Sequence, residues 1–177
     1  MTLKRVAALP VTAALVSALF TASPAGAATT PDLSFAAFGT GSSATAANQA
    51  AYTAALSQQA VFSAATGAVC TGPVTGTSQN FQLVPSGYGA AVTLAFQCGA
   101  PTHTGPLNVM FSGFGTGAAA LEAAGTALGV AMQNEASYTA ATGVKCVDSP
   151  QPDQAQFWQV TTGYAAVGKD MDTCQAP

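Results

Sequence analysis

Charge is scarce in this sequence. Only 6% of its 177 residues are charged: four Lys and Arg, seven Asp and Glu, with a single His besides. A protein that binds nucleic acid needs clustered basic side chains, and this sequence has no such cluster. Disordered chains are poor in apolar residues, whereas 49% of these residues are hydrophobic. We therefore expect a folded protein that does not bind nucleic acid.

Groups for acid–base catalysis are almost missing from a long stretch of the chain. Between Asp32 and Glu122 the only ionisable side chains are tyrosines, cysteines and His103. A catalytic triad would have to recruit His103 from a Pro/Gly/Thr segment that is typical of a linker. The sequence has no Gly-x-Ser-x-Gly nucleophile motif. We predict no catalytic residues, and a hydrolase is the least favoured function.

The first 27 residues have the three-part pattern of a secretory signal peptide. Lys4 and Arg5 precede an apolar run over residues 6–20, and small residues lead to Ala27, after which we expect cleavage. The alternative, a transmembrane anchor, would need about 20 apolar residues. We predict a secreted, extracellular protein with no stable membrane span after cleavage. The Ala-, Thr- and Gly-rich composition is typical of bacteria with GC-rich genomes.

The rest of the chain matches itself when it is shifted by 76 residues. Positions 35–101 and 111–177 align without a gap and share 23 identities, more than an alanine-rich composition gives by chance. Both copies begin with Phe-x-x-Phe-Gly-Thr-Gly. This similarity predicts an internal repeat. The expected organisation is a cleaved signal peptide (1–27), repeat unit 1 (28–101), a linker (102–108) and repeat unit 2 (109–177).

The two units have the same predicted order of elements. A short apolar strand, over 33–38 or 109–114, leads through Gly-Thr-Gly into a helix, and a Thr-Gly pair ends that helix. Three short strands follow. The predicted fold class is α+β, a tandem repeat of two β-α-β-β-β units, each with one helix on a small antiparallel sheet and one intra-unit disulfide. The alanines that form a stripe at helical spacing are Ala44, Ala47, Ala51, Ala55, Ala120, Ala123, Ala127 and Ala131.

Four cysteines in an exported protein predict disulfide bonds. Four cysteines permit three pairings, and equivalent units favour the equivalent bonds Cys70–Cys98 and Cys146–Cys174. Cross-linking between the units is the alternative. A zinc site would need closer cysteine spacing and more than one His, so we predict none.

A glycine motif recurs before each predicted helix. Residues 39–44 match the dinucleotide-binding pattern G-x-G-x-x-A, and residues 115–120 match it again. The acidic residue expected about 20 positions later is missing from the first unit. We interpret the motif as a tight strand-to-helix turn that uses the backbone freedom of glycine. We predict no cofactor.

The second unit contains the only tryptophan. Phe157 matches Phe81 of the first unit and is therefore the better candidate for the core. Because neighbouring residues of a strand point to opposite faces, Trp158 would then point outward, but a core position is the commoner one for tryptophan, and the sequence leaves the choice open. An exposed tryptophan is a good anchor for a binding partner.

Most of the remaining charge also lies in the second unit. Asp170 and Asp172 share one face of the last predicted strand, and could bind calcium only if Asp148 or Asp153 converges on them. Otherwise these groups form a solvated strand end, and we predict no metal site. The candidate binding residues are Lys145, Asp148, Asp153, Trp158, Lys169, Asp170 and Asp172.

The favoured function is a non-enzymatic protein-binding or enzyme-inhibitory module. Its plan resembles that of secreted bacterial enzyme inhibitors with two tandem repeats, although no motif matches residue by residue and no site is carried over. The alternative is a structural component of the cell envelope or extracellular matrix, since a nearly uncharged surface suits packing among like molecules. The expected partner is a secreted protein or a cell-wall component.

Overall fold

The computed structural model describes residues 30–176, so the signal peptide predicted for residues 1–27 lies outside the described residues. The described chain is an α+β fold with two helices and two antiparallel sheets. No helix in this part of the chain is long and apolar enough to cross a membrane. In chain order the elements are β1 (Asp32–Gly41), α1 (Ala44–Thr66), β2 (Cys70–Gln82), β3 (Tyr88–Cys98), β4 (Pro106–Gly117), α2 (Ala120–Thr142), β5 (Lys145–Asp148), β6 (Gln154–Val160) and β7 (Gly163–Gln175).

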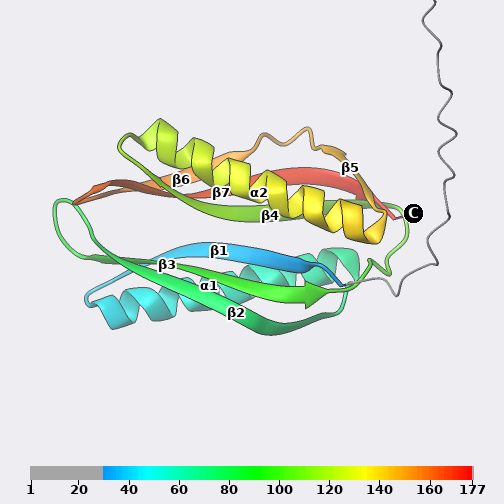
Figure 1. Cartoon of the computed structure of the whole chain (residues 1–177), viewed down its shortest axis with the longest axis horizontal. Helices are drawn as coiled ribbons and strands as arrows, with labels where there is room; N and C mark the ends of the chain where they lie inside the picture. Colours follow the sequence, from blue (N-terminus) through cyan, green and yellow to red (C-terminus); the bar gives the residue numbers. More distant parts are fainter. Residues whose placement is uncertain (1–29, 177) are drawn as a thin grey trace, which may run out of the picture.

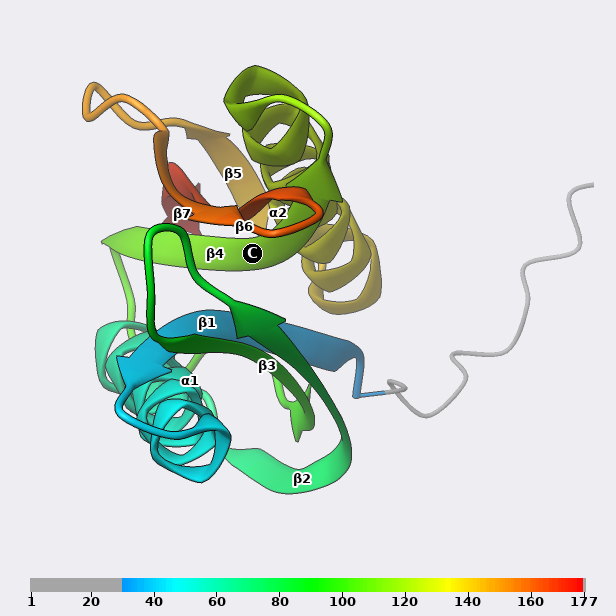
Figure 2. The ribbon, with the colours of Figure 1, turned by 90° about the vertical axis from the view of Figure 1, so that its left-hand side faces the viewer.

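Each sheet carries one helix. The first half of the structure, residues 30–101, has the strand order β1-β3-β2, and α1 packs on this sheet. The second half, residues 106–176, has the order β4-β7-β5, with β6 also paired to β7, and α2 packs on this sheet. Seen along the strands, β1 and β4 lie side by side in the middle and the helices lie on opposite sides (Figure 2). Figure 1 shows the same layers from the side.

The strands differ from their predicted bounds. β1 and β4 continue through both Gly-Thr-Gly segments, which are therefore strand ends and not turns. β4 also includes residues 106–108 of the predicted linker, because Leu107 is buried. In the first half a single strand, β2, replaces the two strands and loop expected there, so this half reads β-α-β-β. In the second half β5 and β6 are separate, as predicted.

Glycine allows each helix to lie directly on its sheet. A Cβ atom on Gly115 would lie 2.5 Å from the backbone nitrogen of Ala127, and one on Gly41 would lie 2.6 Å from that of Ala47. Both alanines are fully buried, as the predicted stripe requires. Neither glycine has a positive φ. The sequence interpretation was therefore wrong about the reason for these glycines: they provide space, not backbone freedom.

The helix ends follow the sequence signals. The backbone N–H of Ala46 donates to Ser43 Oγ at 3.2 Å, which caps α1, and Ala118 N–H donates to a Glu122 carboxylate oxygen at 2.9 Å at the start of α2. Gly67 and Gly143 end the helices in the left-handed conformation, with φ of 68° and 73°.

Four aromatic rings fill the place where the two halves meet. Phe62 of α1 and Tyr138 of α2 lie edge to face with 5.2 Å between ring centroids. Phe35 of β1 contacts Phe62, and Phe111 of β4 contacts both Phe62 and Tyr138. All four rings are almost completely buried. The core is therefore continuous across the two halves.

Polar groups join the inner edges of the sheets. Ser112 of β4 accepts a hydrogen bond from Ala36 N–H at 3.0 Å, and Asn134 of α2 donates to the carbonyl oxygens of Ser34 and Ser112. These bonds satisfy backbone groups of β1 that have no strand partner. At one end of the molecule Leu83 and Val160 form an isolated antiparallel bridge between the halves.

The disulfide bonds are Cys70–Cys98 and Cys146–Cys174, consistent with the pairings that the sequence favours. Cys70 lies opposite Cys98 in the β2–β3 register, and Cys146 lies opposite Cys174 in the β5–β7 register. Each bond therefore joins neighbouring strands of one sheet. Such bonds are compatible with an extracellular location.

We predict that Gly115→Ala lowers the free energy of unfolding by about 1–3 kcal/mol, because the new methyl group would push α2 off its sheet. The matched control is Gly125→Ala, since a Cβ on this exposed helical glycine meets nothing within 4 Å. That change should stabilise the protein by about 0.5–1 kcal/mol. Urea unfolding compares the two variants, and equal effects would contradict the proposed role of Gly115.

Candidate functional site

Six of the seven acidic residues lie in the second half, and all of these except Glu122 gather near β7. Asp170 and Asp172 lie in β7 opposite Phe111 and Val109 of β4, on the sheet face that α2 covers. Glu135 reaches them from α2. We call the five residues the carboxylate cluster: Glu135, Asp148, Asp153, Asp170 and Asp172.

The centre of the carboxylate cluster is compact and buried. Carboxylate oxygens of Glu135, Asp170 and Asp172 lie within 4.8 Å of one another. Asp170 is 5% exposed and Asp172 is 3% exposed. One oxygen of Asp172, Oδ2, is buried and has no hydrogen-bond partner. A buried polar atom without a partner is costly, which makes this arrangement unusual for an ordinary core.

The two outer members come from the far side of β7. Asp148 of β5 lies directly opposite Asp172 in the strand register. Asp153 follows in the loop, and its Oδ1 accepts a hydrogen bond from Met171 N–H at 3.4 Å. The sequence left open whether these aspartates converge on Asp170 and Asp172. In the structure both are near enough to raise the pKa values of Asp170 and Asp172, but neither belongs to the compact group that these two form with Glu135.

Burial and mutual repulsion both favour the protonated carboxyl groups. Burial first, and then the charge of Asp170, raise the pKa of Asp172 to about 7. Burial also raises the pKa of Asp170 to about 6, with a further upward contribution from Asp153. Burial and Asp148 raise the pKa of Glu135. Among the described residues, every charged group that acts on these three carboxyls is itself acidic.

The carboxylate cluster occupies a place that is apolar in the first half. At a shift of 76 residues, Asp170 and Asp172 correspond to Leu94 and Phe96, which are buried in the core. Glu135 corresponds to Gln59. Sequence reasoning missed Glu135, although the change from Gln to Glu between the two aligned helices is a signal that could have identified it.

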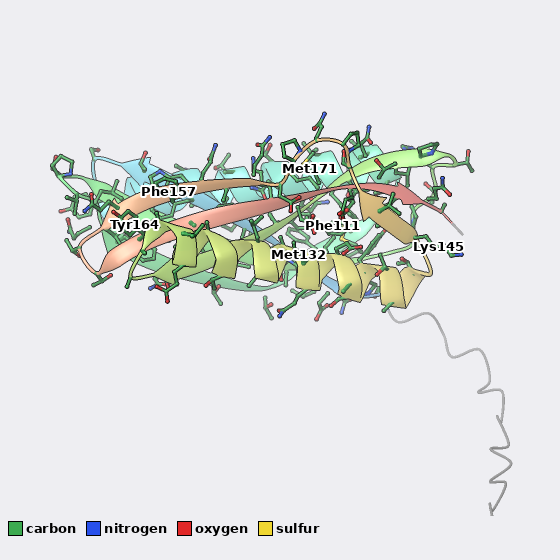
Figure 3. All side chains as sticks on the ribbon, turned by 90° about the horizontal axis from the view of Figure 1, so that it is seen from above. Phe111, Met132, Lys145, Phe157, Tyr164 and Met171 are labelled. Carbon is green, nitrogen blue, oxygen red and sulfur yellow. A yellow bond between two sulfur atoms is a disulfide. The ribbon has the colours of Figure 1, made fainter. Side chains whose placement is uncertain are left out.

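The two lysines of the candidate set lie elsewhere. Lys145 is exposed at the start of β5, at the opposite end of the molecule from Phe157 (Figure 3). Lys169 is half-buried, and it precedes Asp170 in β7, so its side chain points to the other sheet face. Neither lysine contributes to the pKa of the buried aspartates.

The prediction that Phe157 is the better core candidate is wrong, whereas Trp158, whose exposure the sequence leaves open, lies against the first half. Phe157 is 57% exposed and contacts Tyr164 edge to face, at the end of the molecule seen in Figure 3. Trp158 is half-buried and stacks on Phe38 of the first half, with ring centroids 4.1 Å apart and an angle of 16° between the rings. Phe157 and Trp158 do point to opposite faces of β6, as predicted. The face that carries Trp158 is the one that lies against the first half.

His103, the one histidine, has a structural position. Its Nδ1 lies 3.1 Å from the carbonyl oxygen of Ala65, near the end of α1. Thr102 and His103 also donate backbone N–H groups to the carbonyl oxygen of Thr66. The segment after β3 therefore satisfies carbonyl groups at the C-terminus of this helix.

A second surface stands out in the first half: the outer edge of β2. Residues 71–80 of this strand are all exposed. β2 is paired only on its β3 side in the sheet, apart from contacts at its end with β6. Figure 2 shows β2 at the margin of the molecule, away from α2 of the second half.

The strand register identifies which backbone groups face outward. Cys98 N–H donates to Pro31 on the β1 side of β3, so alternation directs Ala91 and Thr93 toward β2. Their partners Gln79 and Thr77 therefore bond to β3. The residues that alternate with them, Gly76, Ser78 and Asn80, direct their N–H and C=O groups to the open edge. Gln82 follows the same alternation, and its carbonyl oxygen accepts a hydrogen bond from the backbone N–H of Thr161 in the second half.

Grooves flank the β2 edge on both sheet faces. On the α1 side a groove of about 450 Å³ is lined by Ala44, Thr45, Asn48, Gln49, Tyr52 and Asn80. On the opposite side a groove of about 270 Å³ is lined by Thr77, Ser78, Gln79, Ala91, Thr93 and Phe114. Both linings are uncharged and combine amide, hydroxyl and aromatic groups.

Comparison with protein-family models, curated proteins and solved structures finds no match for this chain.

We predict that, in a buffer free of divalent cations, the protein loses stability as the pH rises from about 4 to about 8. The pKa of Asp172 is about 7 and that of Asp170 about 6 in the folded protein, against 3.8 as the ordinary value. The folded state therefore holds more protons than the unfolded state in this range, and the loss is complete above the folded pKa. Urea unfolding at several pH values measures the trend, which should be weaker in Asp172→Asn. A rise in stability over the same range would contradict it.

We predict that Trp158→Ala lowers the free energy of unfolding by about 2–3 kcal/mol, because it removes the ring stacked on Phe38. The neighbouring variant Phe157→Ala should cost less than about 1 kcal/mol, since this side chain is mostly exposed. Unfolding followed by circular dichroism gives both values. If Trp158→Ala were as mild as Phe157→Ala, the stacked contact would not hold the halves together.

Proposed function

We propose that the protein is a secreted, non-enzymatic protein-binding or inhibitory module. In this proposal, an extended segment of the partner adds to the sheet as a new strand beside β2. The supporting observation is the exposed edge of β2, where Gly76, Ser78 and Asn80 present backbone donors and acceptors. Strand addition of this kind gives affinity through main-chain hydrogen bonds and specificity through alternate side chains.

The contrast between the two outer edges supports the choice of β2. Long exposed edge strands invite pairing with other chains, and natural proteins protect them with charge, proline or interruption. The corresponding edge of the second half is interrupted between β5 and β6 and carries Pro150, Pro152 and Asp153. β2 has Pro73 and a register irregularity near its start, but from Thr75 to Gln82 it pairs regularly with β3 and contains no proline and no charged residue. An unprotected edge beside a protected one favours a binding role for the unprotected edge.

The grooves beside β2 indicate the chemistry of the partner segment. An added strand would point successive side chains to opposite sheet faces, toward the two grooves. Tyr52 on one side and Phe114 on the other offer aromatic contacts, while Asn48, Gln49 and Gln79 offer amide groups. We infer an extended, uncharged segment with polar and small apolar side chains.

We also propose that the two halves are copies of one unit, as the shift of 76 residues predicts. The matched disulfides, the helix-covered sheets and the strand orders β1-β3-β2 and β4-β7-β5 support this proposal. One copy has kept an open edge and an apolar core. The other has gained the carboxylate cluster and a protected edge.

A structural component of the cell envelope or extracellular matrix is the second candidate. The observation that favours it is the same uncharged edge, because β2 of one molecule could pair with β2 of another. Like charges opposite each other would oppose such pairing, and β2 has none. The two candidates share the edge and differ in the strand that covers it.

We predict that Ser78→Pro abolishes partner binding while changing stability by less than about 1 kcal/mol. Proline removes the outward N–H at this position and leaves the β3 ladder intact, since edge strands tolerate proline there. The wild-type protein, Ser78→Pro and the control Ser78→Thr are immobilised and exposed to secreted proteins and washed cell wall of the source organism. Analytical ultracentrifugation of each variant tests self-association in parallel.

A secreted protein retained by wild type and Ser78→Thr, but not by Ser78→Pro, would support the binding module. Concentration-dependent self-association that only Ser78→Pro loses would favour the structural component. A partner retained equally by all three variants would place binding elsewhere and contradict the proposal for β2.

A further inference from the structure

We propose that Glu135, Asp170 and Asp172 form a binding site for one divalent cation, with Ca²⁺ preferred over Mg²⁺. This site is independent of the β2 edge and belongs to the second half alone. Its three carboxylates each offer an oxygen, and these oxygens lie within 4.8 Å of one another. A single ion between them could contact all three, since Ca²⁺–oxygen distances are about 2.3–2.6 Å.

The unpartnered oxygen of Asp172 points to a ligand. Asp172 is 97% buried, and its Oδ2 atom has no hydrogen-bond donor. Burying an ionised carboxylate without a partner is strongly unfavourable, and proteins avoid it by pairing the group or binding it to a metal ion. The neighbours that could pair with it are Asp170 and Glu135, which are acceptors when ionised. A cation would satisfy this oxygen and its neighbours together.

In the part of the chain that the structure describes, the charged groups that act on Asp170 and Asp172 are all acidic, which favours the binding of a cation. Three ionised carboxylates at the centre would carry a charge of −3, and Asp148 and Asp153 add to the negative potential there. No basic group among the described residues acts on Asp170 or Asp172. A divalent ion would remove most of the repulsion without the need for a buried lysine or arginine.

The sheet is open beside the proposed site. β5 pairs with β7 as far as Asp172, and β6 begins to pair at Lys169, so Asp170 and Met171 have no ladder partner on that side. The loop of residues 149–153 crosses this interval, with Ser149 N–H donating to the Met171 carbonyl oxygen. This loop brings Asp153 close to Asp170.

The ligand set favours Ca²⁺ over Mg²⁺. All the side-chain ligands are carboxylate oxygens, which suit hard cations. Ca²⁺ accepts six to eight oxygens in flexible geometry, and the three carboxylates together offer six oxygens. Mg²⁺ usually keeps several waters, and the burial of Asp170 and Asp172 leaves little surface for them.

The test is thermal unfolding of the purified protein in EDTA and then in excess CaCl₂ or MgCl₂. We expect Ca²⁺ to raise the Tm by about 5 °C or more, Mg²⁺ to raise it less, and calorimetric titration to give one Ca²⁺ per chain. Asp172→Asn should unfold at a higher Tm than wild type in EDTA, because it removes the unpartnered charge, and should lose the Ca²⁺ response.

Two further variants make the result decisive. Glu135→Gln introduces the residue found at the matching position of the first half, so it should fold and should weaken Ca²⁺ binding at least tenfold. Asp32→Asn removes an exposed acid outside the cluster and should respond to Ca²⁺ like wild type. No Tm shift and no heat with either cation in the wild-type protein, or an unchanged response in both cluster variants, would overturn the proposal.

Discussion

The close approach of each helix to its sheet is the constraint on which the rest of the structure depends. Glycine in β1 and β4 faces alanine in α1 and α2, with no room for even one added methyl group at these contacts. Dense packing of this kind gains dispersion energy over a large area from small side chains. It also explains how a chain with few large aromatic residues builds a continuous core. Many of the larger rings lie where the halves meet, around Phe62 and Tyr138 and where Trp158 stacks on Phe38.

The same constraint locates the variation between the halves. On the covered face of β7 the sequence runs from Gly168, which lies under Leu128, to Asp170 and Asp172, which meet Glu135. In the first half the residues matching the two aspartates are Leu94 and Phe96, and they complete an apolar core. The two sheets therefore have the same strand order but bury different side chains, apolar in the first half and acidic in the second. The chain combines an apolar half with an open edge and an acidic half with a protected edge.

Local patterns in the sequence predicted much of this fold. The alanine stripes, the C-terminal helix glycines, the α+β class and the cysteine pairs depend on periodicity and spacing, which the sequence displays directly. The errors concern which part of another element a given residue contacts. Phe157 was expected in the core, and the exposure of Trp158 stayed open, because their strand was considered without the other half, where Trp158 stacks on Phe38. The two Gly-Thr-Gly segments were assigned to turns because the glycines themselves give no sign in the sequence that a helix packs closely on them.

The candidate sites divide in the same way. The sequence placed Asp148, Asp153, Asp170 and Asp172 in one unit, but only the fold brings Glu135 to them and buries Asp172. The β2 edge was not predicted, because residues 71–80 contain the glycine, proline and polar residues typical of a loop. Pairing with β3 holds this segment as a strand in spite of its composition. Strand propensity is weak compared with such tertiary context.

Amide hydrogen exchange along β2 in the dilute, isolated protein tests the central claim, that this edge is free to accept another strand. The account predicts an alternating pattern, with slow exchange at Thr77 and Gln79, which bond to β3, and fast exchange at Gly76, Ser78 and Asn80. Slow exchange at all five amides would contradict the account, because it would mean that the outer edge of β2 is already paired.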